Sequence, residues 1–320
     1  MSKQTYSIDQ FKPEYLHSID ILWNMVFQDY KIPENVFQKQ FFGDFALNSE
    51  GCFVARRNNQ IIGFVMTATK KIPFTPTGEF PGCIPVIMVH PEERRKGIGK
   101  KLLEEAIKFL LQKGETRIRA GYPTYLRGTI LSFLGVSSHW QEAIIFFKKY
   151  GFEVVSSIDS MTVDLAQMEI PSYIYEREEC LKNSGITLEC LQILGQDKFL
   201  DFLSKVFPGS WHEQFSILTS IGKLSAEEIM TVRKNNEFIG FAGPSHISES
   251  GDACLGIGIG LQEDFRGKGI GLILLFKVLE MVRRRGGRRI IAFGAVDKSN
   301  YYGKAGFVPT EIWMVMKKDF

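Results

Sequence analysis

The chain has 320 residues, 44% of them hydrophobic and 23% charged, which are ordinary values for a folded globular protein of about two domains. A net charge of +3 is too small to indicate nucleic-acid binding, and no apolar run is long enough to cross a bilayer. The five scattered cysteines contain no Cys-x-x-Cys pair, so neither a disulfide framework nor a metal site is expected. The polar first ten residues lack a signal-peptide core, and we expect a cytoplasmic location without a membrane partner.

The first half of the sequence alternates between strand and helix patterns. Asn58 and Asn59 separate two strands, and asparagine tolerates the positive φ angles of a tight hairpin turn. The segment after Gly97 has apolar residues at helical spacing and ends at Gly114, a residue type common at helix C-termini. In chain order, we expect a strand over 5–8, helical segments over 13–30, a hairpin over 53–65, a strand over 85–90, a helix over 98–113, a strand over 116–120, a short helix ending at Gly151, and two final strands that include 161–165.

The second half repeats this order. Residues 230–242 resemble 53–65, including an Asn-Asn pair, and 302–307 resemble 147–152. An internal repeat of this kind indicates two copies of one architecture. In chain order, we expect a strand over 187–190, helical segments over 196–221, a hairpin over 230–242, a strand over 254–261, a helix over 270–285, a strand over 289–295, a short helix ending at Gly306, and two final strands that include 313–317.

Two segments fall outside the repeat. Residues 167–185 contain a charged stretch followed by an Asn-Ser-Gly turn, which predicts a linker helix between domains. The first half also has an insertion between 119 and 140. We interpret it as a loop that packs against the second half, with a lid as the alternative.

Each half contains a glycine-rich cassette between a strand and a helix. The first cassette, residues 94–99, reads Arg-Arg-Lys-Gly-Ile-Gly, and the second, residues 266–271, reads Arg-Gly-Lys-Gly-Ile-Gly. Such a turn directs backbone N–H groups and the positive end of a helix toward one point, which suits a diphosphate. A Rossmann turn would need glycine where Leu102 and Leu272 stand, and neither cassette has the spacing of a P-loop. Both match the acyl-CoA turn Gln/Arg-x-x-Gly-x-Gly/Ala.

With these cassettes, the hairpins and the two late Gly-Phe pairs, the chain resembles the GNAT superfamily of N-acetyltransferases over most of both halves. The resemblance implies an α/β fold of two tandem GNAT domains, each with a mixed, mostly antiparallel twisted sheet flanked by helices. We expect a first domain over 1–168, a linker over 169–185 and a second domain over 186–320. The resemblance further implies acetyl-CoA as the co-substrate and a V-shaped opening between two strands for its thioester.

The resemblance also assigns cofactor contacts to both halves. The pantetheine arm would lie along the strand before each cassette, and the pyrophosphate would lie on the cassette itself. In the first half the expected residues are Met88, Val89, His90, Arg94, Arg95, Lys96, Gly97, Ile98, Gly99 and Lys100. In the second half they are Ile259, Gly260, Leu261, Arg266, Gly267, Lys268, Gly269, Ile270, Gly271 and Asn300, with Ser299 as a further contact or a helix cap.

One position separates the two halves. In the family, a tyrosine four residues before the late Gly-Phe pair protonates the leaving thiolate. This position is Tyr302 in the second half and Phe147 in the first, and phenylalanine has no proton to donate. We therefore expect the second domain to be catalytic with Tyr302 as general acid, with Tyr301 as an adjacent alternative, and the first domain to be weaker or non-catalytic.

The general base is not evident from the sequence. His246, Glu249 and Asp252 precede the second cassette but are more typical of a solvated loop, and His212 lies where substrate-facing helices would join. His90 ends a strand in a structural turn, and His139 with Trp140 is interpreted as capping and packing at a helix start. Near-helical spacing indicates that Phe37, Phe41, Phe42 and Phe45 belong to the core.

The leading hypothesis is an acetyl-CoA-dependent N-acetyltransferase that acts on an amine of a small molecule or peptide, as a monomer or homodimer. A non-catalytic acyl-CoA-binding or regulatory protein is the first alternative. A transferase with a longer acyl donor is the second, and a chain whose halves act on one substrate between them is the third.

Overall fold

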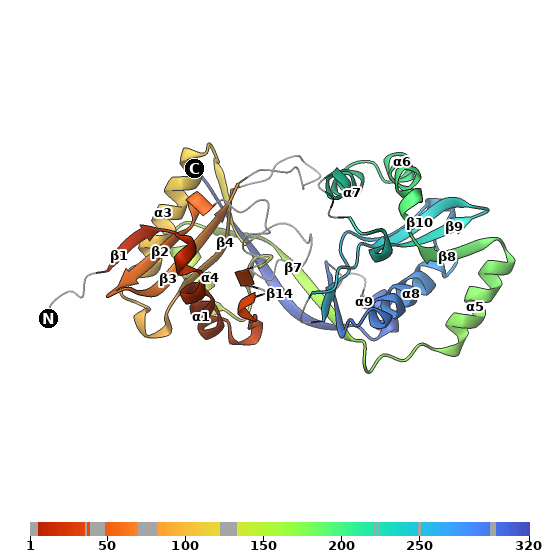
Figure 1. Cartoon of the computed structure of the whole chain (residues 1–320), viewed down its shortest axis with the longest axis horizontal. Helices are drawn as coiled ribbons and strands as arrows, with labels where there is room; N and C mark the ends of the chain where they lie inside the picture. Colours follow the sequence, from red (N-terminus) through yellow and green to blue (C-terminus); the bar gives the residue numbers. More distant parts are fainter. Residues whose placement is uncertain are drawn as a thin grey trace.

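The computed structural model describes residues 6–35, 37–38, 49–69, 82–121, 133–220, 222, 224–248, 251–294 and 299–320. The chain forms two lobes, one built mainly by each half of the sequence (Figure 1). Each lobe has a twisted sheet flanked by helices, so the predicted α/β class is confirmed.

The elements of the first lobe follow the predicted order. They are β1 (Ser7–Gln10), α1 (Leu16–Val26), β2 (Phe53–Arg57), β3 (Gln60–Ala68), β4 (Gly82–Val89), α3 (Ile98–Gln112), β5 (Arg117–Ala120), β6 (Val136–Ser137), α4 (Gln141–Lys149) and β7 (Glu153–Asp164). The β2–β3 turn places Asn58 at φ 48° and Asn59 at φ 65°, which confirms the predicted two-residue hairpin.

The second lobe begins after the linker helix α5 (Ser172–Asn183), which the sequence predicts. Its elements are β8 (Ile186–Cys190), α6 (Gln196–Val206), α7 (Ser210–Ser220), β9 (Met230–Lys234), β10 (Glu237–Gly243), β11 (Asp252–Cys254), β12 (Gly258–Leu261), α8 (Ile270–Arg284), β13 (Arg289–Phe293), α9 (Ser299–Tyr302) and β14 (Val308–Asp319). The single strand expected over 254–261 is divided, because β11 pairs with β13 while β12 pairs with β10.

The described strands form two sheets. The larger has the order β1-β2-β3-β4-β5-β14-β7-β13-β11, with β6 also paired to β14, and the smaller has the order β12-β10-β9-β8. The larger sheet therefore contains strands from both halves of the sequence, and it runs from one lobe into the other (Figure 1).

Two long antiparallel strands, β7 and β14, join the lobes (Figure 1). The end of β14 pairs with β5 of the first lobe, where Met316 lies opposite Ala120. The end of β7 pairs with β13 of the second lobe, where Val163 lies opposite Ile290. Each half thus completes the sheet of the other, and the C-terminus lies in the first lobe.

This exchange corrects the expectation of two final strands per half. Each half has one long strand instead, and the predicted strands at 161–165 and 313–317 fall largely in the distal parts of β7 and β14. A period-two pattern identifies a strand but not its partner, so the exchange could not be inferred from it. The domain limits at 168 and 186 remain a prediction, and the strand pairing crosses them.

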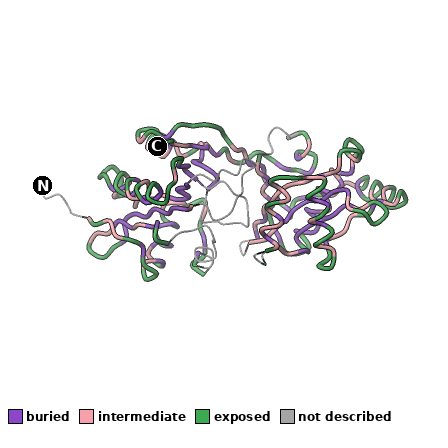
Figure 2. The backbone as a smooth tube through the Cα atoms, turned by 90° about the horizontal axis from the view of Figure 1, so that it is seen from above, coloured by how far each residue is buried: buried purple, intermediate pink, exposed green. Residues whose placement is uncertain are grey.

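Buried residues run through the interior of each lobe (Figure 2). In the first lobe, α1 covers one face of the sheet and α3 covers the other. The α1 face buries Trp23 and Phe37 together with Trp313, which belongs to β14. Phe37 is therefore core, as expected, whereas Phe41, Phe42 and Phe45 lie outside the described residues.

Part of the 119–140 insertion also confirms its predicted packing role. Val136 and Ser137 form β6 and pair with Met314 and Trp313 of β14, so this segment does contact the second half. Residues 122–132 lie outside the described range.

Candidate functional site

The first cassette forms a tight left-handed turn at the start of α3. Gly97 has a φ of 85° and Arg95 a φ of 63°, and the α-helix begins at Ile98. A Cβ at Gly99 would lie 3.3 Å from Cε2 of Phe146 on α4, which is closer than most real contacts. The cassette therefore brings bare backbone close to α4 and aims the helix N-terminus at the space between them.

The strand before the first cassette separates from its parallel neighbour. β4 pairs with β5 only from Gly82 to Ile84, and Pro85, which has no N–H to extend a ladder, follows directly. The rest of β4 remains paired with β3. The resulting V-shaped opening is the one that the sequence resemblance implies.

A cavity of about 770 Å³ occupies this opening, within the usual range for ligand pockets. The cassette and α4 line one end, and Val26 and Phe27 at the end of α1 line the other. Since α1 and α3 cover opposite faces of the sheet, the cavity passes from one face to the other. Seven of the cofactor contacts predicted for this half line the cavity: Met88, Val89, Arg94, Arg95, Gly97, Gly99 and Lys100.

The remaining predicted residues of this half lie outside the cavity lining. Ile98 is 1% exposed and packs in the core. Lys96 pairs with Glu93 at 3.2 Å, and the ring of His90 accepts a hydrogen bond from the amide of Glu92. The ring of His90 therefore caps the turn after β4, and its expected cofactor contact remains a prediction.

The second cassette has the same backbone, with Gly269 at φ 80° before α8. Its surroundings differ. The Tyr301 hydroxyl donates to the Gly271 carbonyl at 2.6 Å, and a Cβ on Gly269 would lie 3.1 Å from a guanidinium nitrogen of Arg177 on α5. Lys277 of α8 holds α5 in place through Glu178 at 3.1 Å. A linker side chain and a tyrosine therefore contact the turn where the first cassette faces a cavity.

The other predicted residues of the second half are also placed. Ile259, Gly260 and Leu261 belong to β12, Arg266 donates from Nε to the Leu261 carbonyl at 2.9 Å, and Ile270 is buried. Gly267 and Lys268 are exposed, and Asn300 lies on α9.

Comparison with known proteins follows the same division into halves. Residues 48–154 match the family model described as acetyltransferase (GNAT) domain, and residues 197–307 match the one described as acetyltransferase (GNAT) family. Together the two matches span more than half of the chain. The chain belongs to the GNAT acetyltransferase family. The matches end near the start of β7 and just before β14, so they exclude nearly all of the exchanged strands.

Three solved structures share this GNAT fold over nearly the whole chain. One is a GCN5-related glucosamine N-acetyltransferase region of a fungal multi-domain GH3 beta-N-acetylglucosaminidase, with a TM-score of 0.79, 18% identity and coverage of 98% of this chain but only 38% of that one. Another is a GCN5-related N-acetyltransferase from Sphaerobacter thermophilus, with a TM-score of 0.71, 14% identity and coverage of 100% and 96%.

The third is a tandem GNAT protein from the clavulanic acid biosynthesis pathway, with a TM-score of 0.69, 14% identity and 98% coverage of both chains. These identities establish the tandem fold alone. No significant match is found among curated protein sequences.

The tyrosine predicted as the general acid of this GNAT protein is buried. Tyr302 is 9% exposed and packs against Tyr301 and Phe307 in the core of the second lobe, and burial raises its pKa above the ordinary value. Phe147 occupies the equivalent position in the first lobe, where it lines the cavity. The role of Tyr302 remains a prediction.

The predicted base candidates of the second half mostly have ionic partners. Both carboxylate oxygens of Asp252 accept from Arg289, at 2.9 and 2.8 Å, and His246 lies 2.9 Å from the buried carboxylate of Glu228. His212 lies 3.3 Å from the Ser216 hydroxyl on its own helix. Glu249 is outside the described residues.

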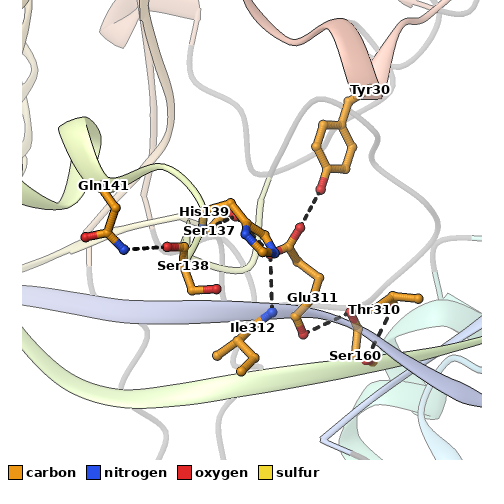
Figure 3. A network of polar contacts seen from close by, with 9 residues as sticks. All are labelled: Tyr30, Ser137, Ser138, His139, Gln141, Ser160, Thr310, Glu311 and Ile312. Atoms are coloured by element: carbon orange, nitrogen blue, oxygen red, sulfur yellow. Dashed lines mark hydrogen bonds and ion pairs between the residues drawn. The ribbon is translucent and has the colours of Figure 1, made fainter.

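A polar network near the first cavity was not predicted (Figure 3). Glu311 of β14 accepts hydrogen bonds from Tyr30 at 2.9 Å and Ser137 at 2.8 Å. His139, which lines the cavity, has Nε2 at 3.8 Å from a Glu311 oxygen. The sequence contains no signal for this network, because Glu311 is 172 positions from His139 and reaches it only through the exchanged strand.

The described residues include no group of three or more potential metal ligands and no helix long and apolar enough to span a membrane. The five cysteines are free, and burial raises the pKa of Cys52, Cys83 and Cys254 to about 12.

Proposed function

We propose that this protein is an acetyl-CoA-dependent N-acetyltransferase that binds acetyl-CoA in the cavity of the first lobe. The observation that carries the proposal is the 770 Å³ cavity that joins the first cassette to the end of α1 through the opening between β4 and β5. Acetyl-CoA would enter from the cassette side, and the acceptor amine from the α1 side. This assignment differs from the sequence-based preference for the second lobe.

The charges of the two cassettes also favour the first lobe. Residues 94–101 contain five lysines and arginines, whereas the equivalent residues 266–273 contain Arg266 and Lys268 only. Arg94, Arg95 and Lys100 line the cavity beside the helix N-terminus. Cations and free N–H groups together favour a pyrophosphate at this position.

The walls of the opening suit an extended pantetheine arm. Beyond Ile84 the main chain of β4 has no strand partner on the β5 side among the described residues, so its polar groups can pair with the amides of the arm as an added strand would. Ile87 and Val89 of β4 and Phe146 of α4 provide apolar contacts. The residues present therefore fit an acyl-CoA substrate.

Phe147 does not prevent the reaction in this lobe. An alkyl thiol has a pKa of about 8.5, so it leaves as a thiolate near neutral pH without a general acid. The attacking amine must be neutral, which makes the removal of its proton the more demanding requirement.

A second candidate places the chemistry in the second lobe, with Tyr302 as the general acid. It is supported by the family position of Tyr302 and by the retained backbone of the second cassette. The variant Tyr302→Phe separates the two candidates. Acetyl transfer through Tyr302 predicts a loss of about 100-fold or more in kcat, whereas transfer in the first lobe predicts a kcat near that of the wild type.

The cofactor assignment is tested by calorimetric titration of acetyl-CoA into a matched pair of variants, Lys96→Glu and Lys268→Glu. Both lysines are exposed. They occupy the same position of the two cassettes, directly before Gly97 and Gly269. We expect Lys96→Glu to weaken binding about fivefold or more through reversed charge near the phosphates. Lys268→Glu should leave the wild-type affinity unchanged.

The wild-type protein is then mixed with acetyl-CoA and a panel of amines, both small molecules and peptides, and the release of the free thiol is measured. Loss of affinity in Lys268→Glu alone would move the cofactor to the second lobe. Binding of acetyl-CoA without turnover on every amine class would instead support the regulatory alternative.

A further inference from the structure

The geometry points to a proton-accepting dyad, His139 with Glu311, at the acceptor end of the first cavity. In it, His139 is the general base for the acceptor amine, and Glu311 is the residue that positions its ring. This inference rests on the function proposed above, and it names a base that the family matches and the sequence leave unassigned.

His139 is accessible to an acceptor. Its side chain lines the cavity and is 75% exposed. It lies two residues before α4, on a segment fixed by β6 and by the hydrogen bond from its own amide to the Ser137 hydroxyl at 3.1 Å. The next residue, Trp140, packs edge-on against Phe133 with centroids 4.8 Å apart and lies 5.4 Å from the ring of Phe27 at the end of α1. The imidazole is thus accessible to a substrate, while the backbone that carries it is held.

The carboxylate of Glu311 lies near the imidazole ring of His139. Its side chain is 14% exposed, and its carboxylate accepts from Tyr30 and Ser137 (Figure 3). Its Oε1 lies 3.8 Å from Nε2 of His139, which is an ion-pair distance. A carboxylate on this side favours the tautomer with the proton on Nε2 and leaves Nδ1 free to accept one.

The dyad is assembled by the strand exchange. Tyr30 and His139 belong to the first half of the sequence, whereas Glu311 lies on β14, which extends from the second lobe. Among the residues that the structure describes, the charged groups that act on Tyr30 are Glu311, Asp29 and Arg289. Burial first, and then the hydrogen bond to Glu311, raise the pKa of Tyr30 above its ordinary value, so its phenol remains a donor to the carboxylate.

The proton balance of the step is simple. Nδ1 of His139 takes one proton from the acceptor ammonium, and the neutral amine then attacks the thioester carbonyl. As the C–N bond forms and the C–S bond breaks, the sulfur leaves with the electron pair and receives the second amine proton. The imidazolium then returns its proton to solvent.

Activity is measured as kcat and KM against pH for His139→Gln and Glu311→Gln. The matched control is His17→Gln, because His17 also faces a carboxylate, Glu34 at 2.7 Å, is 64% exposed, and does not line the cavity. We expect His139→Gln to lose about 100-fold or more in kcat and to lose the rise of rate with pH that a base produces, with KM for acetyl-CoA unchanged. His17→Gln should behave as the wild type.

External imidazole should restore turnover to His139→Ala, which a merely structural role would not allow. A pH profile of His139→Gln that matches the wild type, or the absence of rescue, would overturn the catalytic role. These results require only that the wild type transfers acetyl groups, so they are distinct from a failure of the proposed function, which would appear as an inactive wild type.

The positioning role is tested without turnover. Nitrogen-15 chemical shifts of the His139 ring report which nitrogen carries the proton in the neutral form. We expect a predominance of the Nε2–H tautomer in the wild type and a mixture in Glu311→Gln, a change that keeps the side-chain volume and leaves one amide oxygen to accept from either Tyr30 or Ser137. The same tautomer ratio in both proteins would exclude Glu311 as the positioning residue.

Discussion

At the scale of single residues, Arg95 and Gly267 mark the divergence of the two cassettes. Both occupy the left-handed region, with φ of 63° and 73°, but only glycine does so without strain. Arg95 is 82% exposed, lines the cavity and pairs with Glu142 at 3.2 Å. An arginine retained in an unfavourable backbone conformation beside the proposed phosphate site is consistent with a binding role.

The variant Arg95→Gly introduces the residue of the second cassette at this position. Relief of strain and the added flexibility of the unfolded chain oppose each other, so the free energy of unfolding should stay within about 1 kcal/mol of the wild type. Affinity for acetyl-CoA should fall about two- to fivefold, because an exposed charge near the phosphates is lost. Chemical denaturation and calorimetry measure the two quantities, and an unchanged Kd would remove Arg95 from the site.

At the scale of elements, the contact between β6 and β14 depends on one close backbone approach. A Cβ on Gly135 would lie 2.5 Å from the carbonyl oxygen of Met314, so only glycine fits beside β14 at this point. The pairing of β6 with β14, directly after Gly135, fixes the position of Ser137. The Ser137 hydroxyl in turn donates a hydrogen bond to Glu311. The position of the proposed dyad is therefore set by this contact.

The variant Gly135→Ala should destabilise the protein by about 1–3 kcal/mol, the usual cost of overpacking, because the clash is with backbone. It should also lower kcat, since β14 must shift relative to His139. The control is Gly303→Ala, where a Cβ would meet nothing within 4 Å and stability should change by less than about 0.5 kcal/mol. Equal thermal stability of the two variants would contradict the close approach.

At the scale of the whole molecule, the exchanged strands make the lobes interdependent. Without β14, β5 would keep a paired neighbour on one side alone, β4, and without β7, β13 would keep β11 alone. Trp313 of β14 is also part of the first lobe's core. We infer that neither half of the sequence buries its edge strand and core alone.

The intact chain should consequently unfold in one cooperative transition. Far-UV circular dichroism and tryptophan fluorescence should give coincident denaturant curves. This comparison is informative because Trp211 lies in the second lobe, whereas Trp23 and Trp313 lie in the first. Two separated transitions would show that the lobes are independent despite the shared sheet.

Cleavage of the linker gives a sharper test of the exchange. A protease site inserted between Asn183 and Ser184, in the exposed turn after α5, should yield two fragments that elute together under native conditions, because β7 and β14 still pair. A chain that ends at Phe307 lacks β14 and should be largely insoluble, since β5 becomes an open edge. Separation of the nicked fragments would contradict the assignment.

The sequence determined the repeated architecture, because its signals are local. Asn58 and Asn59 set a hairpin turn, Gly97 and Gly269 set the start of a helix, and apolar spacing set α3 and α8. These features were sufficient to identify the family and to locate both cassettes. They are nearly the same in the two halves. The contrast between Phe147 and Tyr302 was the difference that led the sequence analysis to favour the second lobe as the catalytic one.

Only the tertiary structure revealed the cavity of the first lobe and the groups that surround it. Contacts such as Arg177 with the second cassette and Glu311 with His139 join residues far apart in the chain. Strand patterns are periodic but carry no record of the partner strand, so nothing local distinguishes β14 paired within its own half from β14 extended into the other. The glycine cassettes could be identified from the sequence because a backbone turn is set by neighbouring residues. A site built from both halves forms only when the strands of the two halves have paired.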